Sequence, residues 1–167
     1  QPFTGVDVNT ESTIIELQGL FIKVAQVVAE TFQIDVDNIR ITATTTGKVP
    51  NTSPTAASSG SDLNGMAAKN AAEQIKDRMT DVAAEQFNVP RAEIVFSSNR
   101  IYAGNRSISF AELAALSWEK RVSLSATGFY RTPKIHWDFA SNSGRPFYYF
   151  TYGVAAAEVA IDALTGE

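Results

Sequence analysis

The sequence contains no cysteine and only one histidine, His136, among its 167 residues. Without thiols, the chain can form neither a disulfide nor a cysteine-ligated zinc or iron–sulfur site of its own. A single histidine cannot by itself build a cluster of metal ligands. These absences exclude the usual side-chain metal sites from this chain, and they are compatible with a reducing compartment such as the cytoplasm.

An excess of basic residues is also missing, since 14 Lys and Arg stand against 18 Asp and Glu. The net charge of -4 at pH 7 argues against nucleic acid or an acidic membrane as partner, because both require positive charge to neutralise phosphates. No apolar run approaches the roughly 20 residues that a membrane-spanning helix needs, and the sequence does not open on a signal-peptide pattern. We therefore expect neither a nucleic-acid nor a membrane partner, and a cytoplasmic location.

The residues that are present are typical of a globular domain, with 44% hydrophobic and 19% charged residues. Apolar residues recur at helical spacing in some segments, and β-branched and aromatic residues gather in others. Helices are predicted at residues 18–32, 62–87 and 109–118, and strands within residues 6–15, 34–45, 92–108, 121–137 and 145–164. This order predicts an α+β fold with a mixed sheet, two longer amphipathic helices and one short helix.

Residues 1–167 are expected to form a single piece of one domain. Its first part, residues 1–90, has the order strand, helix, strand, helix, and residues 91–167 form a strand-rich part with one short helix. The sequence closes on IDALTGE, in which a predicted strand meets an unfinished turn. We therefore expect the chain to be a fragment of a longer protein.

The loop VPNTSPTAASSGSDLNG, residues 49–65, is unusually rich in small hydrogen-bonding residues, and it leads into the longest predicted helix. Free backbone N–H groups at a helix N-terminus form an anion site when the approach is not blocked by bulky side chains. In that interpretation Ser58, Ser59 and Ser61 add hydroxyl donors, and Gly60 permits close approach. The alternative is a plain linker in which Ser61 or Asp62 caps the helix.

A second short segment, Gln18-Gly19, is predicted to precede the first long helix in the same way, so two helix N-termini could face one phosphorylated ligand. Other candidates carry less weight. His136 lies beside aromatic residues on a predicted strand, which is typical of a packed or surface histidine. Glu16 is an isolated acid near a strand end and gives no acid–base pair.

Four segments together resemble the molybdenum-binding region of bacterial xanthine dehydrogenases. These segments are KVPNTSPTAASSGSDLNGMA (48–67), VSLSATGFYRTPK (122–134), GRPFYYFTYGVAAAEV (144–159) and IDALTGE (161–167). VPNTSPTAAS followed by DLNG is specific to the molybdenum hydroxylases, and LSATGFYRTP favours xanthine dehydrogenase over aldehyde oxidase within them. The resemblance covers most of the chain from Gln18 onward.

The resemblance implies a large enzyme that oxidises hypoxanthine and xanthine to urate, inserting an oxygen derived from water and passing electrons to NAD. Molybdopterin would bind in the region of this chain, and FAD and iron–sulfur clusters would bind in other domains or subunits, which are the implied partners. The implied cofactor contacts are Gln18, Gly19, Thr55, Ala56, Ala57, Ser58, Ser59 and Gly60. Ala57 would line the molybdenum site without being a side-chain ligand.

The sequence also departs from the family pattern. The glycine-rich segment that precedes the family's Gln-Gly-Leu is absent before Gln18. So are the glycine-rich loop with its glutamate, the arginine loop that orients substrate, and the catalytic glutamate. The resemblance therefore implies no catalytic residue in this fragment, no cofactor in the isolated chain, and no activity alone. Two alternatives stay open: a stand-alone α+β binding or structural module that has lost the cofactor site, and a fragment of another molybdenum hydroxylase such as aldehyde oxidase.

Overall fold

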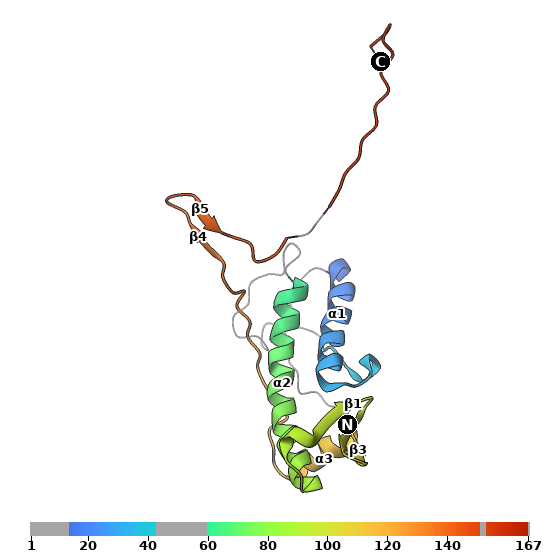
Figure 1. Ribbon diagram of the computed structural model, residues 1–167, viewed down its shortest axis with the longest axis vertical. Helices are drawn as coiled ribbons and strands as arrows, with labels where there is room; N and C mark the ends of the chain where they lie inside the picture. The colour runs from blue at the N-terminus through green and yellow to red at the C-terminus, as the bar shows by residue number, and fades with distance from the viewer. Residues whose placement is uncertain (1–13, 43–59, 151–152, 167) are drawn as a thin grey trace. The chain divides into compact units, whose positions relative to one another are not determined.

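The structure is a computed structural model that describes residues 14–42, 60–150 and 153–166, with side chains described from residue 21 onward in the first of these ranges. Contacts divide the chain into two compact units, Gln1–Arg131 and Thr132–Glu167. Helices dominate the first unit, and the second contains one small hairpin (Figure 1). The two units are described separately below.

Two long helices form the frame of the first unit. Helix α1 (Ile14–Phe32) and helix α2 (Gly60–Phe87) lie side by side (Figure 1), with a short 3-10 helix, η1 (Val36–Asn38), after α1. Both predicted amphipathic helices are confirmed. Small and large apolar side chains share their buried faces; Gly65 of α2, for example, is buried, and a Cβ atom there would lie 3.5 Å from the Val27 side chain of α1.

A three-stranded antiparallel sheet and a short helix complete the core of the first unit. A one-turn 3-10 helix, η4 (Arg91–Glu93), leads into strands β1 (Ile94–Ser97), β2 (Arg100–Ala103) and β3 (Arg106–Ser109). The predicted Ser-Asn and Gly-Asn turns join these strands, and Ser98, Asn99 and Gly104 have positive φ, as tight hairpins require. Helix α3 (Phe110–Glu119) follows directly.

The predicted capping box opens α3. The Glu112 backbone N–H donates to Ser109 Oγ at 3.2 Å, and the Ser109 N–H donates to Glu112 Oε2 at 2.7 Å. These two bonds satisfy donors that a helix start otherwise leaves free. Helix α3 and the three-stranded sheet cover the C-terminal half of α2. The buried core contains Val24, Val28, Phe32, Ile75, Met79, Val82, Phe87, Phe96, Ile101 and Leu113.

Basic side chains from other elements cap the C-termini of both long helices. Lys76 Nζ donates to the Thr31 carbonyl at 2.7 Å near the end of α1, and Arg106 donates to the Phe87 carbonyl at 2.6 Å at the end of α2. The last carbonyls of a helix have no intrahelical partner, and cations are favoured there by the helix dipole. The end of α1 is thereby fixed to the middle of α2, and the end of α2 is fixed to strand β3.

Two predictions for the N-terminal region are wrong where the structure describes it. The strand predicted over 6–15 fails at its end, because α1 begins at Ile14; residues 6–13 lie outside the described part of the chain. After the predicted turn, residues 39–42 form no strand, although Ile39 and Ile41 are half-buried and alternate with exposed neighbours. The alternation reflects burial of one face, and a strand also requires a hydrogen-bonded partner.

The chain from residue 121 onward, which includes the whole second unit, differs most from the sequence prediction. Strands β4 (His136–Asp138) and β5 (Ser143–Arg145) pair as a short antiparallel hairpin, whereas residues 121–135 and the described residues of 146–164 form no regular strand. Residues 153–162 follow as an extended trace (Figure 1). The α+β class is confirmed, but the described strands form two antiparallel sheets instead of the predicted mixed sheet.

Within the described ranges, none of the helices has the length and apolar character that crossing a membrane would need.

Candidate functional site

The N-terminus of α2 is the part of the predicted site that the structure describes. Helix α2 begins at Gly60, which is buried, and Ser61 and Asp62 follow in the first turn. The first four N–H groups of any helix have no intrahelical acceptor, so this end presents donors that need acceptors from outside the helix, and it carries partial positive charge. Because Gly60 has no side chain, it does not cover these donors.

Two polar side-chain atoms near this helix end are buried without a hydrogen-bond partner among the described residues. They are Oδ1 of Asp62, an acceptor, and Nδ2 of Asn64, a donor. A buried polar group without a partner costs about 1–3 kcal/mol, so such groups are normally paired. The first turn of α2 therefore presents one donor and one acceptor that further groups could satisfy.

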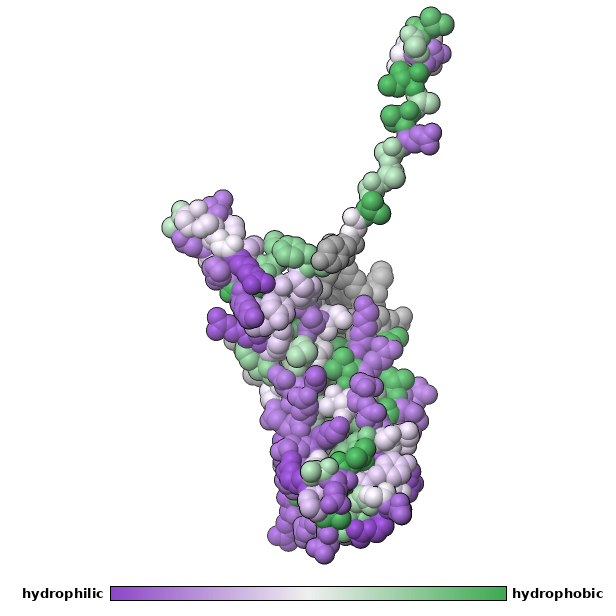
Figure 2. Space-filling model, in the orientation of Figure 1, coloured by the Kyte–Doolittle hydropathy of each residue, from purple (hydrophilic) through white to green (hydrophobic). Residues whose placement is uncertain are grey.

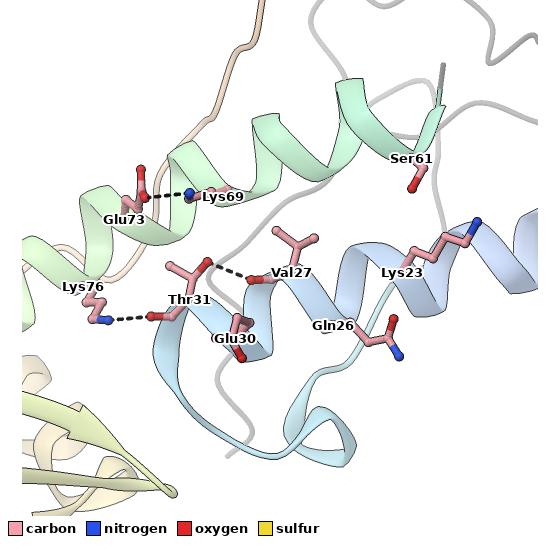
Figure 3. A pocket seen from close by; sticks show the side chains of 9 residues that line it. All are labelled: Lys23, Gln26, Val27, Glu30, Thr31, Ser61, Lys69, Glu73 and Lys76. Carbon is pink, nitrogen blue, oxygen red and sulfur yellow. Dashed lines mark hydrogen bonds and ion pairs between the residues drawn. The ribbon is translucent and has the colours of Figure 1, made fainter. Parts of the chain in front are cut away.

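A groove of about 590 Å³ runs between α1 and α2 from this helix end. Figure 3 shows Lys69, Glu73 and Lys76 along α2, with Ser61 at its first turn. The wall from α1 is formed by Lys23, Gln26, Val27, Glu30 and Thr31. Three lysines and two glutamates give the lining an excess of positive charge, in contrast to the net charge of the chain.

The lysines of this groove have different roles. Lys76 donates to Thr31 and lies 4.9 Å from the centre of the Phe96 ring, so it serves the packing of the unit. Partial burial of its ammonium group lowers the pKa of Lys76, and the nearby carboxylates of Glu73 and Glu30 oppose that shift. Lys69 is half-exposed and forms a 3.6 Å ion pair with Glu73. The positive charge of the groove is thus partly neutralised by its glutamates.

One prediction about the helix ends is wrong. Gln18 and Gly19 do not precede the first long helix, because α1 begins at Ile14 and both residues lie inside it. The backbone N–H of Gln18 is therefore used within the helix, and only one of the two predicted helix N-termini coincides with its predicted segment. The side chains of Gln18 and Gly19 are not described, and their contact with a cofactor stays a prediction.

The structure describes only some of the other predicted site residues. Gly60 is the first residue of α2, two residues before the predicted start at residue 62, whereas Thr55, Ala56, Ala57, Ser58 and Ser59 fall outside the described residues. Glu16 lies in α1 rather than near a strand end, with its side chain not described. His136 is exposed on β4, opposite Arg145. In the described ranges, no group of three His, Cys, Asp or Glu side chains could hold a metal ion.

The described geometry suits binding rather than acid–base chemistry. The helix N-terminus supplies backbone donors, Gly60 places no side chain over them, and Asn64 and Asp62 supply a donor and an acceptor without a partner among the described residues. The backbone donors and Asn64 fit an anionic cofactor, whereas the Asp62 carboxylate repels an anion and fits only a hydrogen-bond donor of such a cofactor. Sequence reasoning missed Asn64; its place in the DLNG motif that carries the family resemblance was the available signal.

Comparison with known proteins identifies the relatives of this chain. A model of the molybdopterin cofactor-binding domain matches residues 5–167. Xanthine dehydrogenase of Oryza sativa subsp. japonica is 46% identical over 97% of this chain, which spans 11% of that protein. Xanthine dehydrogenase/oxidase of Mus musculus is 43% identical over 90% of this chain, which spans 10% of that protein. The chain thus spans about a tenth of the length of these curated relatives.

A solved structure also resembles the fold. Quinoline 2-oxidoreductase from Pseudomonas putida 86 superposes with a TM-score of 0.55 over 75% of this chain and 17% of that one, at 18% sequence identity. At this level of identity the likeness concerns the fold alone.

Proposed function

Because this chain belongs to the molybdopterin cofactor-binding domain family, we propose that it forms part of the molybdopterin site of an oxidoreductase of the xanthine dehydrogenase type. The enzyme would hydroxylate hypoxanthine and xanthine to urate with NAD as electron acceptor, and so act in purine metabolism. The identity to xanthine dehydrogenases over nearly the whole chain carries this proposal. A cytoplasmic location is part of it.

The proposed role of this chain is to bind and orient the cofactor. When bound, the molybdenum cofactor supplies the redox chemistry that adds a water-derived oxygen to the purine. The backbone N–H groups at the start of α2 would hold its anionic or acceptor groups, and Asn64 would donate a further hydrogen bond. Gly60 would allow the backbone to approach closely, and Ala57 would line the metal site.

The proposal assigns no proton transfer to this chain. The acid–base residues, the FAD and the iron–sulfur clusters would belong to the remaining domains or subunits, which are the proposed partners together with the purine substrate. The isolated chain would therefore hold no molybdenum and would not oxidise xanthine. A buried charged cofactor needs partners on every side, and this chain supplies one wall.

Gly60→Val in the complete enzyme tests the proposed site. The added side chain should cover the first-turn N–H groups and crowd the cofactor, so molybdenum content and urate formation should fall together, with flavin reduction by NADH retained. Gly153→Val is the matched control, because a Cβ atom at Gly153 meets none of the described atoms within 4 Å and Gly153 has no positive φ. Wild-type molybdenum content in Gly60→Val would contradict the proposal.

A further inference from the structure

An extended segment, residues 122–129, lies along α2 and runs antiparallel to it. Three side chains one helical turn apart on α2 donate to its backbone carbonyls. Asn70 Nδ2 donates to the Phe129 carbonyl at 2.6 Å, and Gln74 Nε2 donates to that of Thr127 at 3.4 Å. Arg78 Nη1 donates to the carbonyls of Ser123 at 2.5 Å and Ser125 at 3.2 Å. We call Asn70, Gln74 and Arg78 the α2 ladder.

Two side chains of the α2 ladder also donate hydrogen bonds to the backbone of α2. Gln74 Nε2 also donates to the Asn70 carbonyl at 3.1 Å, and Arg78 Nε donates to the Gln74 carbonyl at 3.0 Å. Gln74 and Arg78 therefore bridge their own helix and the extended segment, whereas Asn70 donates to the segment alone. Such a ladder replaces, on this edge of the segment, the backbone donors that a neighbouring strand would supply.

Gly128 is the point of closest approach between the segment and the helix. A Cβ atom at Gly128 would lie 1.8 Å from the Ala67 carbonyl oxygen and 2.9 Å from the Ala71 backbone nitrogen. No real Cβ tolerates such contact with backbone, so any larger residue must displace either the segment or the second and third turns of α2. The contact lies about two turns from Gly60.

The N-terminal half of α2 is thus held by two neighbours in the described structure. Gly65 packs against Val27 of α1, and the Ala67–Ala71 backbone packs against Gly128. The Asn70 bond to Phe129 closes the ladder at the end nearest to Gly60. The sheet and α3 pack farther along α2, so they do not replace these contacts.

We propose that Asn70 and Gly128 are positioning residues for the cofactor-binding end of α2, and this proposal rests on the proposed function. Holding residues 122–129 against Ala67–Ala71 fixes the direction of the first turns of α2. The backbone donors of those turns must be aligned within a fraction of an ångström to hold a cofactor. Arg78, at the far end of the ladder, would stabilise the segment without positioning the site.

The experiment compares Asn70→Ala, Gln74→Ala and Arg78→Ala in the complete enzyme. Three quantities are measured: hydrogen–deuterium exchange of the amides of residues 60–68, molybdenum per flavin, and the thermal unfolding midpoint. Asn70→Ala should raise exchange at residues 60–68 about fivefold, the equilibrium ratio for one lost hydrogen bond, and should lower molybdenum content. Arg78→Ala should leave both near wild type, yet lower the unfolding midpoint most.

The two rankings are therefore opposite, which a purely structural ladder would not produce. If molybdenum content follows the unfolding midpoint across the three variants, or does not change in Asn70→Ala, the proposal is wrong. Gly128→Ala, with Gly153→Ala as its control in open space, should lower molybdenum content further than Asn70→Ala. If Gly128→Ala fails to fold, the Asn70 comparison still decides.

Failure of this proposal can be told apart from failure of the proposed function. If Gly60→Val empties the site while Asn70→Ala and Gly128→Ala retain normal molybdenum, only the positioning role is wrong. If Gly60→Val retains normal molybdenum, the site is not at the start of α2, and both proposals fall.

Discussion

Two segments with strand-like sequences, residues 122–129 and 153–162, have different surroundings. The first lies against α2, where its even-numbered side chains Val122, Leu124 and Ala126 pack on the core and its odd-numbered carbonyls accept from the α2 ladder. The second has fully exposed side chains and no backbone partner among the described residues, apart from the turn at its end.

The comparison shows that contacts with another element, and not the β propensity of the segment itself, determine whether an extended segment is packed against the protein. Val154 is 98% exposed and Val159 83%, although both are good strand formers. Figure 2 shows hydrophobic residues uncovered along this last segment. The first segment is held because α2 donates hydrogen bonds to its carbonyls and the core packs against its apolar side chains.

The largest expected effect comes from removing a side chain that the first unit buries. Met79 is fully buried in α2, and Met79→Ala should destabilise the chain by about 2–5 kcal/mol, because a cavity remains where the side chain was. Val154→Ala, in the unpartnered segment, should change stability by less than about 0.5 kcal/mol. Urea unfolding of both variants measures this contrast; a large effect of Val154→Ala would show that the segment is covered.

A smaller effect is expected from the ladder itself. Arg78→Ala removes the donor for the Ser123 and Ser125 carbonyls and should cost about 1–2 kcal/mol. Arg131→Ala is the matched control, since no hydrogen bond or ion pair involves this exposed arginine among the described residues. Chemical denaturation with the two variants side by side decides; equal midpoints would mean that the Arg78 bonds do not stabilise the position of residues 122–129.

The smallest effect concerns the helix that leads into the first segment. Hydrogen bonds from the Ser109 backbone N–H and hydroxyl lower the pKa of Glu112 in the folded chain below its usual 4.5. A carboxyl group whose pKa is lower in the folded chain than in the unfolded chain stabilises the fold at pH values above the unfolded pKa. This contribution is lost as the pH falls through the folded pKa. Glu112→Gln should therefore lose less stability than wild type between about pH 5 and pH 3. Thermal melts across this range test it, and parallel curves would contradict it.

Part of the fold could be predicted from sequence because its signals are local. The apolar spacing of residues 62–87, the Ser109–Glu112 capping box and the Ser-Asn and Gly-Asn turns all involve residues close in sequence. The start of α1 at Ile14 could not be predicted, since its β-branched residues favour a strand by propensity alone. For the candidate site, the start of α2 at Gly60 agrees with the predicted loop–helix junction, and the Gln18–Gly19 junction does not.

The sequence by itself determined the α+β class, the long helix after the small-residue loop, and the family resemblance, because these depend on composition, spacing and motifs within short windows. Only the tertiary structure decided that Asn70, Gln74 and Arg78 meet the carbonyls of residues 122–129, and that Gly128 leaves no room beside Ala67. The physical reason is that these contacts join residues about 45–60 positions apart, whose approach depends on packing of the whole unit.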